Sequence, residues 1–182
     1  MSTKIKSILE DYVIIPENVS VDLSNKKIKV SGPVGNNEAN LFHPMISFDK
    51  KENKIILKSV KQTKNEKKIL KSFKAHLNNL ILGVSKLYTY KLKICSGHFP
   101  MSVSLSNNKV IIKNFFAEKV PREAKILQHV NVKLDNDILT VTGTNKELVG
   151  QTAANIEQAC RLTNKDRRVF MDGIYIISKG EE

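Results

Sequence analysis

The chain has 182 residues and a mass of 20.5 kDa, which fits one medium domain or two small ones and excludes a large multidomain enzyme. Hydrophobic residues make up 41% and charged residues 26%, so the chain can bury a core and is not a disordered tail. Thirty Lys and Arg against 18 Asp and Glu give a net charge of +12, which indicates a polyanionic partner, either nucleic acid or an anionic membrane surface.

The apolar segments and the cysteines narrow the possible partners and the expected compartment. The apolar runs are short and interrupted by Lys, far below the roughly 20 residues of a membrane-spanning helix, so we expect no membrane span or membrane partner. The first 11 residues lack the apolar core of a targeting signal, which makes the cytosol the expected compartment. Cys95 and Cys160 form no CxxC pair and are expected to be reduced, buried thiols.

The first half of the chain predicts two hairpins followed by a helix. Residues 19–30 and 46–57 alternate apolar and polar side chains on both sides of a polar turn, the pattern of antiparallel strands with one buried face. Thr63 and Glu66 form a capping box that begins the helix, and Gly83 is expected to end it as a left-handed C-cap.

The second half repeats this order. Residues 101–112 align with residues 19–30 without gaps, and six of the 12 positions are identical. A second hairpin pattern follows at 130–141, and a capping box of Thr144 with Glu147 begins a second helix, in which Cys160 belongs to the buried stripe.

The duplication predicts the fold class. We expect an α+β protein of two tandem duplicated domains, each an antiparallel sheet of hairpins with one helix packed on it. The predicted domains are residues 1–84, and residues 85–182 with a basic C-terminal RNA-binding segment.

Positive charge is unevenly distributed along the sequence. Residues 67–117 contain nine Lys and no acidic residue, whereas a merely solubilising surface mixes both signs. A polyanion-facing role is favoured over a simply solvated basic face.

The sequence offers little for catalysis or metal binding. Cys95 and His98 have the spacing of a metal-ligand pair, but no second Cys/His pair completes four ligands. The sequence points to no carboxylate that would orient any of the four His residues, and the carboxylates lie in turns or caps. Gly32-Pro33-x-Gly35 lacks phosphate-loop spacing and predicts a turn, as does Asp135-Asn136-Asp137. We therefore predict no catalytic residue, no metal and no cofactor.

Basic and aromatic residues interleave near the C-terminus, around a predicted Asp172-Gly173 turn. Arg and Lys can contact phosphates while an aromatic ring anchors the segment or stacks on a base. For Phe170 we favour packing over stacking. The cations interpreted as RNA-facing are Lys165, Arg167, Arg168 and Lys179.

The same segment carries a family resemblance. The pattern runs through Gln158, Leu162, Lys165, Arg168, Phe170, Asp172-Gly173-Ile174-Tyr175-Ile176 and Lys179. It resembles the universal ribosomal protein L-six family, and within it the eukaryotic large-subunit branch called L-nine. Further matching segments are Ile15-Pro16-Glu17-Asn18-Val19, Gly32-Pro33-x-Gly35, Gly83-Val84, His98-Phe99-Pro100, Lys113-Asn114-Phe115, Glu118-Lys119 and Glu147-Leu148-Val149.

The resemblance implies a non-enzymatic constituent of the large ribosomal subunit that binds 28S-type ribosomal RNA near the sarcin-ricin loop and the stalk base. It implies neighbouring ribosomal proteins, translational GTPases docking nearby, and a cytoplasmic ribosomal location with nucleolar transit during assembly. Carried onto this sequence, the RNA-facing positions would be Lys165, Arg167, Arg168 and Lys179, with Lys86, Lys91, Lys93 and His98 as weaker candidates.

Two other functions remain open at this stage. One is a free-standing RNA-binding assembly factor or RNA-processing enzyme with a site at His98 or Cys95. The other is a stand-alone binder of double-stranded RNA. Ribosomal occupancy, turnover of RNA and affinity for arbitrary duplexes would separate these three possibilities.

Overall fold

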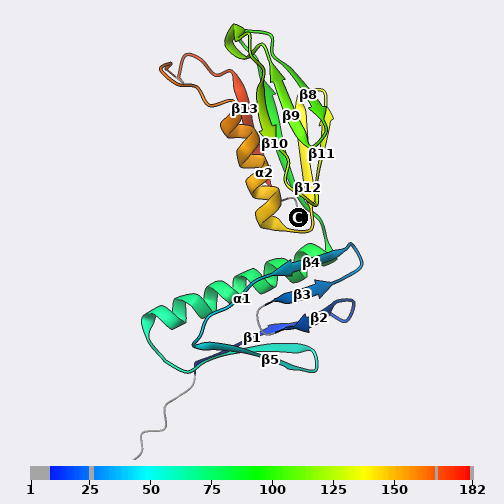
Figure 1. The fold of residues 1–182 in the computed structure, drawn as a ribbon, viewed down its shortest axis with the longest axis vertical. Coiled ribbons are helices and arrows are strands. Elements are labelled where there is room, and N and C mark those ends of the chain that lie inside the picture. Colours follow the sequence, from blue (N-terminus) through cyan, green and yellow to red (C-terminus); the bar gives the residue numbers. More distant parts are fainter. Residues whose placement is uncertain (1–8, 25–26, 167, 181–182) are drawn as a thin grey trace, which may run out of the picture. The chain divides into compact units, whose positions relative to one another are not determined.

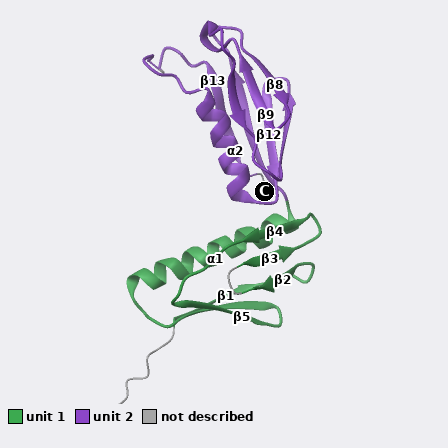
Figure 2. Cartoon of the chain, in the orientation of Figure 1, with its two compact units in different colours: residues 1–86 green, residues 87–182 purple. Residues whose placement is uncertain are grey.

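The computed structural model describes residues 9–24, 27–166 and 168–180. The chain divides into two compact units, residues 1–86 (unit 1) and residues 87–182 (unit 2), each with its own core (Figure 2). Both units combine antiparallel sheets with one long helix, which confirms the predicted α+β class with tandem duplicated domains. Within the described ranges, no helix is long and apolar enough to cross a membrane.

Unit 1 contains two three-stranded sheets and the helix α1. The sheet orders are β1-β6-β5 and β2-β3-β4, and α1 packs against β1, β3, β4 and β6, so it spans both sheets (Figure 1). The elements are β1 Leu9–Ile14, β2 Ser20–Leu23, β3 Ile28–Ser31, β4 Asn36–Ala39, β5 Ile46–Lys51, β6 Lys54–Ser59 and α1 Lys64–Ser85.

Unit 2 repeats this topology and adds a strand. The sheet β10-β9-β8 corresponds to β4-β3-β2, and β11-β12-β7 corresponds to β5-β6-β1, while β13 pairs with the other edge of β7. The elements are β7 Tyr88–Cys95, β8 Ser102–Ser106, β9 Lys109–Lys113, the 3-10 turn η1 Phe115–Ala117, β10 Arg122–Lys125, β11 Val130–Asp135, β12 Ile138–Gly143, α2 Lys146–Ala159 and β13 Gly173–Lys179.

All four predicted hairpins are confirmed: β2–β3, β5–β6, β8–β9 and β11–β12 pair antiparallel. The second hairpin of each unit is tighter than expected, because Lys51 pairs with Lys54 and Asp135 with Ile138, leaving two-residue loops. Five further strands complete the sheets and were not predicted from the sequence, namely β1, β4, β7, β10 and β13.

The helix ends differ in detail from the predicted caps. The N-cap of α2 is Asn145 rather than Thr144, since the Asn145 side-chain oxygen accepts hydrogen bonds from the N–H groups of Glu147 and Leu148. Thr63 occupies the N-cap position of α1, but within the described chain its side chain makes no capping hydrogen bond. Thr and Asn both occur at N-caps, with Asn preferred, and the capping-box spacing alone pointed to Thr144.

The predicted C-cap at Gly83 is wrong, because Gly83 is buried within α1 and the helix continues to Ser85. A left-handed cap is not needed at this end. The Leu82 carbonyl accepts from the Lys86 N–H at 2.8 Å, and the Val84 carbonyl accepts from the Val34 N–H at 3.1 Å. The latter bond docks the β3–β4 turn, the predicted turn at residues 32–35, onto the end of α1.

Each unit buries an apolar core between its helix and its sheets. In unit 2 the core includes Leu92, Val141 and Ile156, all fully buried, and burying each such side chain stabilises the fold by roughly 1.5–3 kcal/mol. Cys160 belongs to this core as predicted, and burial raises the pKa of its thiol to about 11. Cys95 is only partly buried, and both thiols are free.

Candidate nucleic-acid interface

The basic C-terminal segment is attached to unit 2 through Asp172. The two carboxylate oxygens accept hydrogen bonds from the backbone N–H groups of Gly97 at 2.7 Å, His98 at 3.1 Å and Phe99 at 3.0 Å. The His98 ring nitrogen Nδ1 lies 3.3 Å from the same carboxylate. Burial raises the pKa of Asp172, but the backbone hydrogen bonds outweigh it and leave the pKa below its ordinary value. The predicted Asp172-Gly173 turn is wrong, because this pair leads directly into β13.

Position 173 favours glycine because the Tyr175 ring lies close to its backbone, and not because the chain turns there. A Cβ atom there would lie 3.1 Å from the ring carbon Cζ of Tyr175, and the backbone has φ +157°. The Tyr175 ring therefore covers the backbone directly after Asp172 and supports the start of β13.

An aromatic cluster supports the segment that precedes Asp172. The Phe170 ring lies 5.1 Å from the His98 ring and 5.7 Å from the Phe116 ring, centroid to centroid. Phe116 also contacts Phe99 at 5.5 Å and Phe115 at 5.1 Å, and Phe115 is fully buried. Phe170 thus packs against unit 2, as favoured from the sequence, and its ring is held on at least two sides.

Two of the predicted RNA-facing cations lie in the segment around Phe170, and one of them, Lys165, contacts the aromatic cluster. We define the basic loop as residues 163–166 and 168–172. The Lys165 ammonium lies 5.6 Å from the centre of the Phe170 ring. The Arg168 side chain is 90% exposed and pairs with Asp166 at 3.1 Å, and this hydrogen bond holds the pKa of Asp166 below its ordinary value. Arg167, the third predicted cation of this segment, lies outside the described residues.

The remaining predicted cations do not join this cluster. Lys91 and Lys93 lie on β7 and alternate with buried Tyr90 and Leu92, so they face away from the core on the outer side of the four-stranded sheet. Lys179 pairs in register with Tyr90, so it lies on the opposite face of the sheet from Lys91 and Lys93. Lys86 belongs to unit 1. Of the eight predicted residues, Lys165 and His98 both contact Phe170, and Arg168 belongs to the same loop through its pair with Asp166.

An open hollow of about 780 Å³ borders the basic loop. Its lining is mostly apolar and includes Cys95, Ser96, Gly97, His98, Val169, Met171, Asp172 and Tyr175. Val169 and Met171 are 59% and 63% exposed, although they are apolar. Neither residue was predicted from the sequence, and the available signal was the short apolar run of residues 169–171 between charged Arg168 and Asp172.

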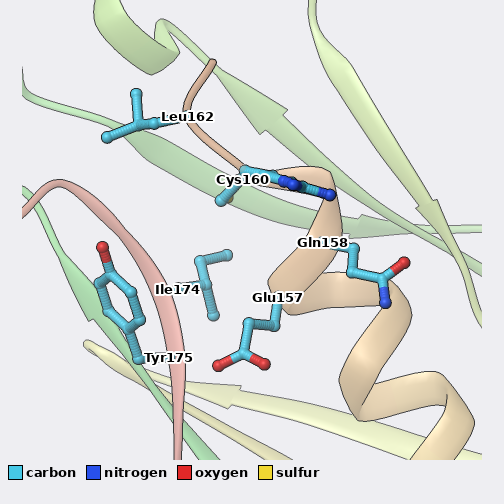
Figure 3. Close-up of a pocket in the computed structure, with 7 residues that line it drawn as sticks. Glu157, Gln158, Cys160, Leu162, Ile174 and Tyr175 are labelled. Atoms are coloured by element: carbon cyan, nitrogen blue, oxygen red, sulfur yellow. The ribbon is translucent and has the colours of Figure 1, made fainter. Parts of the chain in front are cut away.

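A second hollow, of about 380 Å³, lies between the end of α2 and β13 (Figure 3). Glu157 extends from α2 on one side, and Ile174 and Tyr175 come from β13 on the other (Figure 3). The Glu157 carboxylate accepts a hydrogen bond from the Ile176 N–H at 3.2 Å. This bond joins the added strand to the helix, so Glu157 has a structural role here.

Arg122 holds the other side of unit 2 together and was also not singled out from the sequence. Its guanidinium makes two hydrogen bonds to the Glu118 carboxylate and donates to the backbone carbonyls of Ala159 and Arg161, which end α2. It also lies 4.3 Å from the centre of the Phe115 ring. Hydrogen bonding to Arg122 lowers the pKa of Glu118. These contacts make Arg122 a structural cation.

Among the described residues, no group of three His, Cys, Asp or Glu side chains could hold a metal ion. The site consists of exposed cations on a packed aromatic base, with a carboxylate anchor. Such an arrangement can bind a polyanion, because it presents fixed positive charges without the paired acid and base of a hydrolytic site.

Comparison with known proteins identifies the family. The family described as "Ribosomal protein L6" matches residues 15–87 and 99–173. This chain belongs to the ribosomal protein L6 family. The two matched segments fall in unit 1 and unit 2, with residue 87 at the start of unit 2, in agreement with the duplication. The second segment includes Lys165, Arg168, Phe170 and Asp172.

Similar proteins span nearly the whole chain. The "Large ribosomal subunit protein uL6" of Methanococcus vannielii is 40% identical over 175 residues, covering 96% of both chains. The protein of the same name from Methanobrevibacter smithii is 40% identical over 171 residues, which cover 94% of this chain and 96% of the relative. The one from Methanosarcina mazei is 42% identical over 165 residues, which cover 91% of this chain and 94% of the relative.

L6 family members are structural components, so the comparisons confirm the predicted family and the prediction that the chain is not an enzyme. The three relatives are archaeal, and the narrower resemblance to the eukaryotic L-nine branch stays a prediction.

Proposed function

We propose that this chain is a constituent of the large ribosomal subunit that binds large-subunit ribosomal RNA mainly through unit 2. The relatives that match along 91–96% of this chain are named as large ribosomal subunit proteins. The observation that supports the RNA contact is the basic loop, in which exposed Lys165 lies over the packed Phe170 ring and Arg168 is 90% exposed beside Asp166.

The geometry favours binding because the loop is preorganised. Phe170 and Asp172 fix its last residues to the 97–99 backbone, so little ordering is needed when RNA arrives. Lys165 supplies a point charge, and Arg168 can exchange its exposed Asp166 partner for a phosphate oxygen, with which guanidinium groups form bidentate hydrogen bonds. The function is then a binding free energy rather than a rate enhancement.

The other predicted cations complete the proposed surface. We assign Arg167 to the same phosphate contact by its place in the sequence. His98 contributes through the ring that packs on Phe170. Lys91 and Lys93 form a separate patch on the outer face of β7, and Lys179 and Lys86 lie elsewhere, so we treat these four as secondary contacts.

Finer features of the proposal rest on the resemblance alone. They are membership in the eukaryotic L-nine branch, a site near the sarcin-ricin loop and the stalk base, neighbouring ribosomal proteins, translational GTPases docking nearby, and a cytoplasmic location with nucleolar transit. The proposed domains are the N-terminal repeat at 1–84 and the C-terminal repeat at 85–182. Crosslinking of the protein to RNA inside cells, followed by sequencing of the attached fragment, tests the RNA site.

The main test replaces Lys165, Arg167 and Arg168 together with Ala. We expect reduced incorporation into large subunits and a salt slope of RNA binding smaller by roughly 2–3, because each phosphate contact contributes about 0.7–0.9. The fold should persist, since the described members of this set are exposed. The matched control replaces Lys119, Lys125 and Lys133, which are exposed cations elsewhere in unit 2. Equal sedimentation of the two variants with large subunits would reject the assignment.

The rival functions predict different distributions. A free-standing assembly factor or RNA-processing enzyme would stay in ribosome-free extract, whereas a ribosomal constituent should remain near-stoichiometric with large subunits after a high-salt wash. A general double-stranded-RNA binder would bind arbitrary duplexes as well as it binds ribosomal RNA. Family membership favours the ribosomal constituent.

A further inference from the structure

The two duplicated helices have the same structural role but very different charges. Both helices pack against three equivalent strands, α1 on β1, β4 and β6 and α2 on β7, β10 and β12. In α1 the sequence contains five Lys and one Glu, whereas α2 contains one Lys and two Glu. Because one scaffold accepts both compositions, packing of the fold does not explain the lysines of α1.

Four of these lysines form a continuous exposed row. Lys64, Lys67, Lys68 and Lys71 are all exposed and follow the i, i+3, i+4, i+7 spacing that places side chains on one face of a helix. We call this set the lysine stripe. Lys74 is different, because its ammonium pairs with Asp11 at 2.6 Å and lies 5.6 Å from the centre of the Tyr12 ring. Of the five, Lys74 alone lies within ion-pair distance of a carboxylate among the described residues, and Lys71 adds a longer-range attraction to the same Asp11.

The stripe opposes the stability of its own helix. Lys64 and Lys68, and likewise Lys67 and Lys71, are like charges four residues apart, which repel each other. Lys64 and Lys67 also lie in the first turn of α1, where the positive end of the helix dipole disfavours cations. A bound polyanion would reverse both effects, because its negative charges would lie closest to this end.

The chemistry of the stripe fits a nucleic-acid backbone better than a protein partner. The exposed neighbours Asn65 and Ser72 are polar, and no aromatic or Arg is part of the row. Protein interfaces are typically enriched in aromatic residues and Arg and depleted of Lys. Lysines are flexible point charges that bind phosphates without reading base edges.

We propose that the lysine stripe of α1 binds the phosphate backbone of ribosomal RNA independently of base sequence, as a second contact carried by unit 1. This inference rests on the proposed function for the identity of the RNA. It does not depend on the basic loop, because the two sets of cations belong to different units.

The test measures binding of the full chain to protein-free large-subunit ribosomal RNA between 50 and 200 mM salt. The stripe variant replaces Lys64, Lys67, Lys68 and Lys71 with Gln, which keeps helix propensity high. The control variant removes the same charge from four other exposed lysines of unit 1, namely Lys27, Lys29, Lys51 and Lys61. We expect the salt slope of the stripe variant to fall by roughly 3, so that the added salt weakens wild-type binding on the order of 100-fold more than it weakens the variant.

The outcomes separate this inference from the proposed function. If the stripe variant binds RNA like the control variant, the stripe is not an RNA contact, and an acidic protein would be its remaining partner. If the wild-type chain neither binds ribosomal RNA nor sediments with large subunits, the proposed function itself fails. If the stripe binds RNA independently of base sequence, the stripe variant should lose affinity equally for ribosomal RNA and for an unrelated RNA duplex. A loss of affinity for ribosomal RNA alone would overturn the claim of sequence independence.

Discussion

The two units of this molecule show how one duplicated scaffold acquires two kinds of basic surface. Residues 1–86 contain 16 Lys and no Arg against eight acidic residues, a net charge of +8. Residues 87–182 contain ten Lys and all four Arg against ten acidic residues, a net charge of +4. The unit with the smaller net charge carries the added strand, the aromatic cluster and the anchored loop. The net charge of a unit therefore sets its general attraction to a polyanion. A defined binding site requires in addition that packed side chains hold a few cations in place.

The difference can be traced to one connection in each unit. In unit 1, residues 32–35 form a tight turn between β3 and β4, closed by a Gly32 N–H to Gly35 carbonyl hydrogen bond. The equivalent connection of unit 2 is longer and carries Phe115 and Phe116. Those rings support Phe170 directly or through each other. Lengthening this connection thus provided the base on which the C-terminal extension packs.

The largest effect on this comparison is expected from Asp172→Ala. The change leaves the N–H groups of Gly97, His98 and Phe99 without their acceptor, so we expect unit 2 to lose about 3 kcal/mol while unit 1 is unaffected. Chemical denaturation combined with hydrogen exchange resolves the two units. Asp166→Ala is the control, because that exposed carboxylate contacts Arg168 within the same loop, and its loss should change stability little.

Acid provides a second test of the same anchor. The pKa of Asp172 lies below its ordinary value of 3.8, so its contribution to stability is complete above about pH 4 and is lost as the pH falls through the folded-state pKa. Asp172→Asn should remove this part of the acid sensitivity of unit 2. Unchanged acid sensitivity in that variant would show that the carboxylate is not the anchor.

A smaller effect is expected in unit 1 from Gly32→Ala. The added Cβ would lie 2.7 Å from the Val84 carbonyl oxygen and 2.8 Å from its Cγ2 atom, so the turn must move away from α1. We expect a loss of about 2 kcal/mol, measured by thermal or chemical unfolding. Gly150→Ala in α2 is the matched control, because its Cβ would meet only ordinary contacts at 3.6 Å or more and should stabilise the helix. Equal effects of the two changes would contradict the close approach at Gly32.

The smallest expected effect concerns the strained backbone of the longer connection. Ala117 is exposed and has φ +58°, a left-handed conformation that favours glycine. Ala117→Gly should therefore stabilise unit 2 by about 0.5 kcal/mol after the entropy of the unfolded chain is included. The same substitution at exposed Ala75, within α1, should destabilise by about 1 kcal/mol. Opposite signs in the two unfolding experiments are the expected result.

Sequence periodicity predicted the parts of the fold that have a strong local pattern. The four hairpins and two helices follow from alternation and helical spacing, and the duplication doubled that signal. The strand β4 has the polar sequence Asn36-Asn37-Glu38-Ala39 and forms because it pairs with β3. The capping-box spacing pointed to Thr144, whereas the N-cap is its neighbour Asn145, which is the preferred residue type at that position.

The candidate site was predictable only as a list of cations. Lys165 and Arg168 follow from the basic C-terminal pattern, and the family match covers that segment. The role of Asp172 could not be read from the sequence, because its partners lie 73–75 residues earlier in the chain and Asp-Gly is a common turn pair. Arg122 was overlooked for the same reason, since it contacts carbonyls 37 and 39 residues away.

Both thiols of the chain belong to unit 2, and they differ in accessibility. Cys160 is 5% exposed and its thiol has a pKa of about 11, so it is largely protonated and shielded from alkylating reagents while the core is closed. Its labelling rate therefore reports the opening of one half of the molecule, without an engineered probe and without a background signal from the other half.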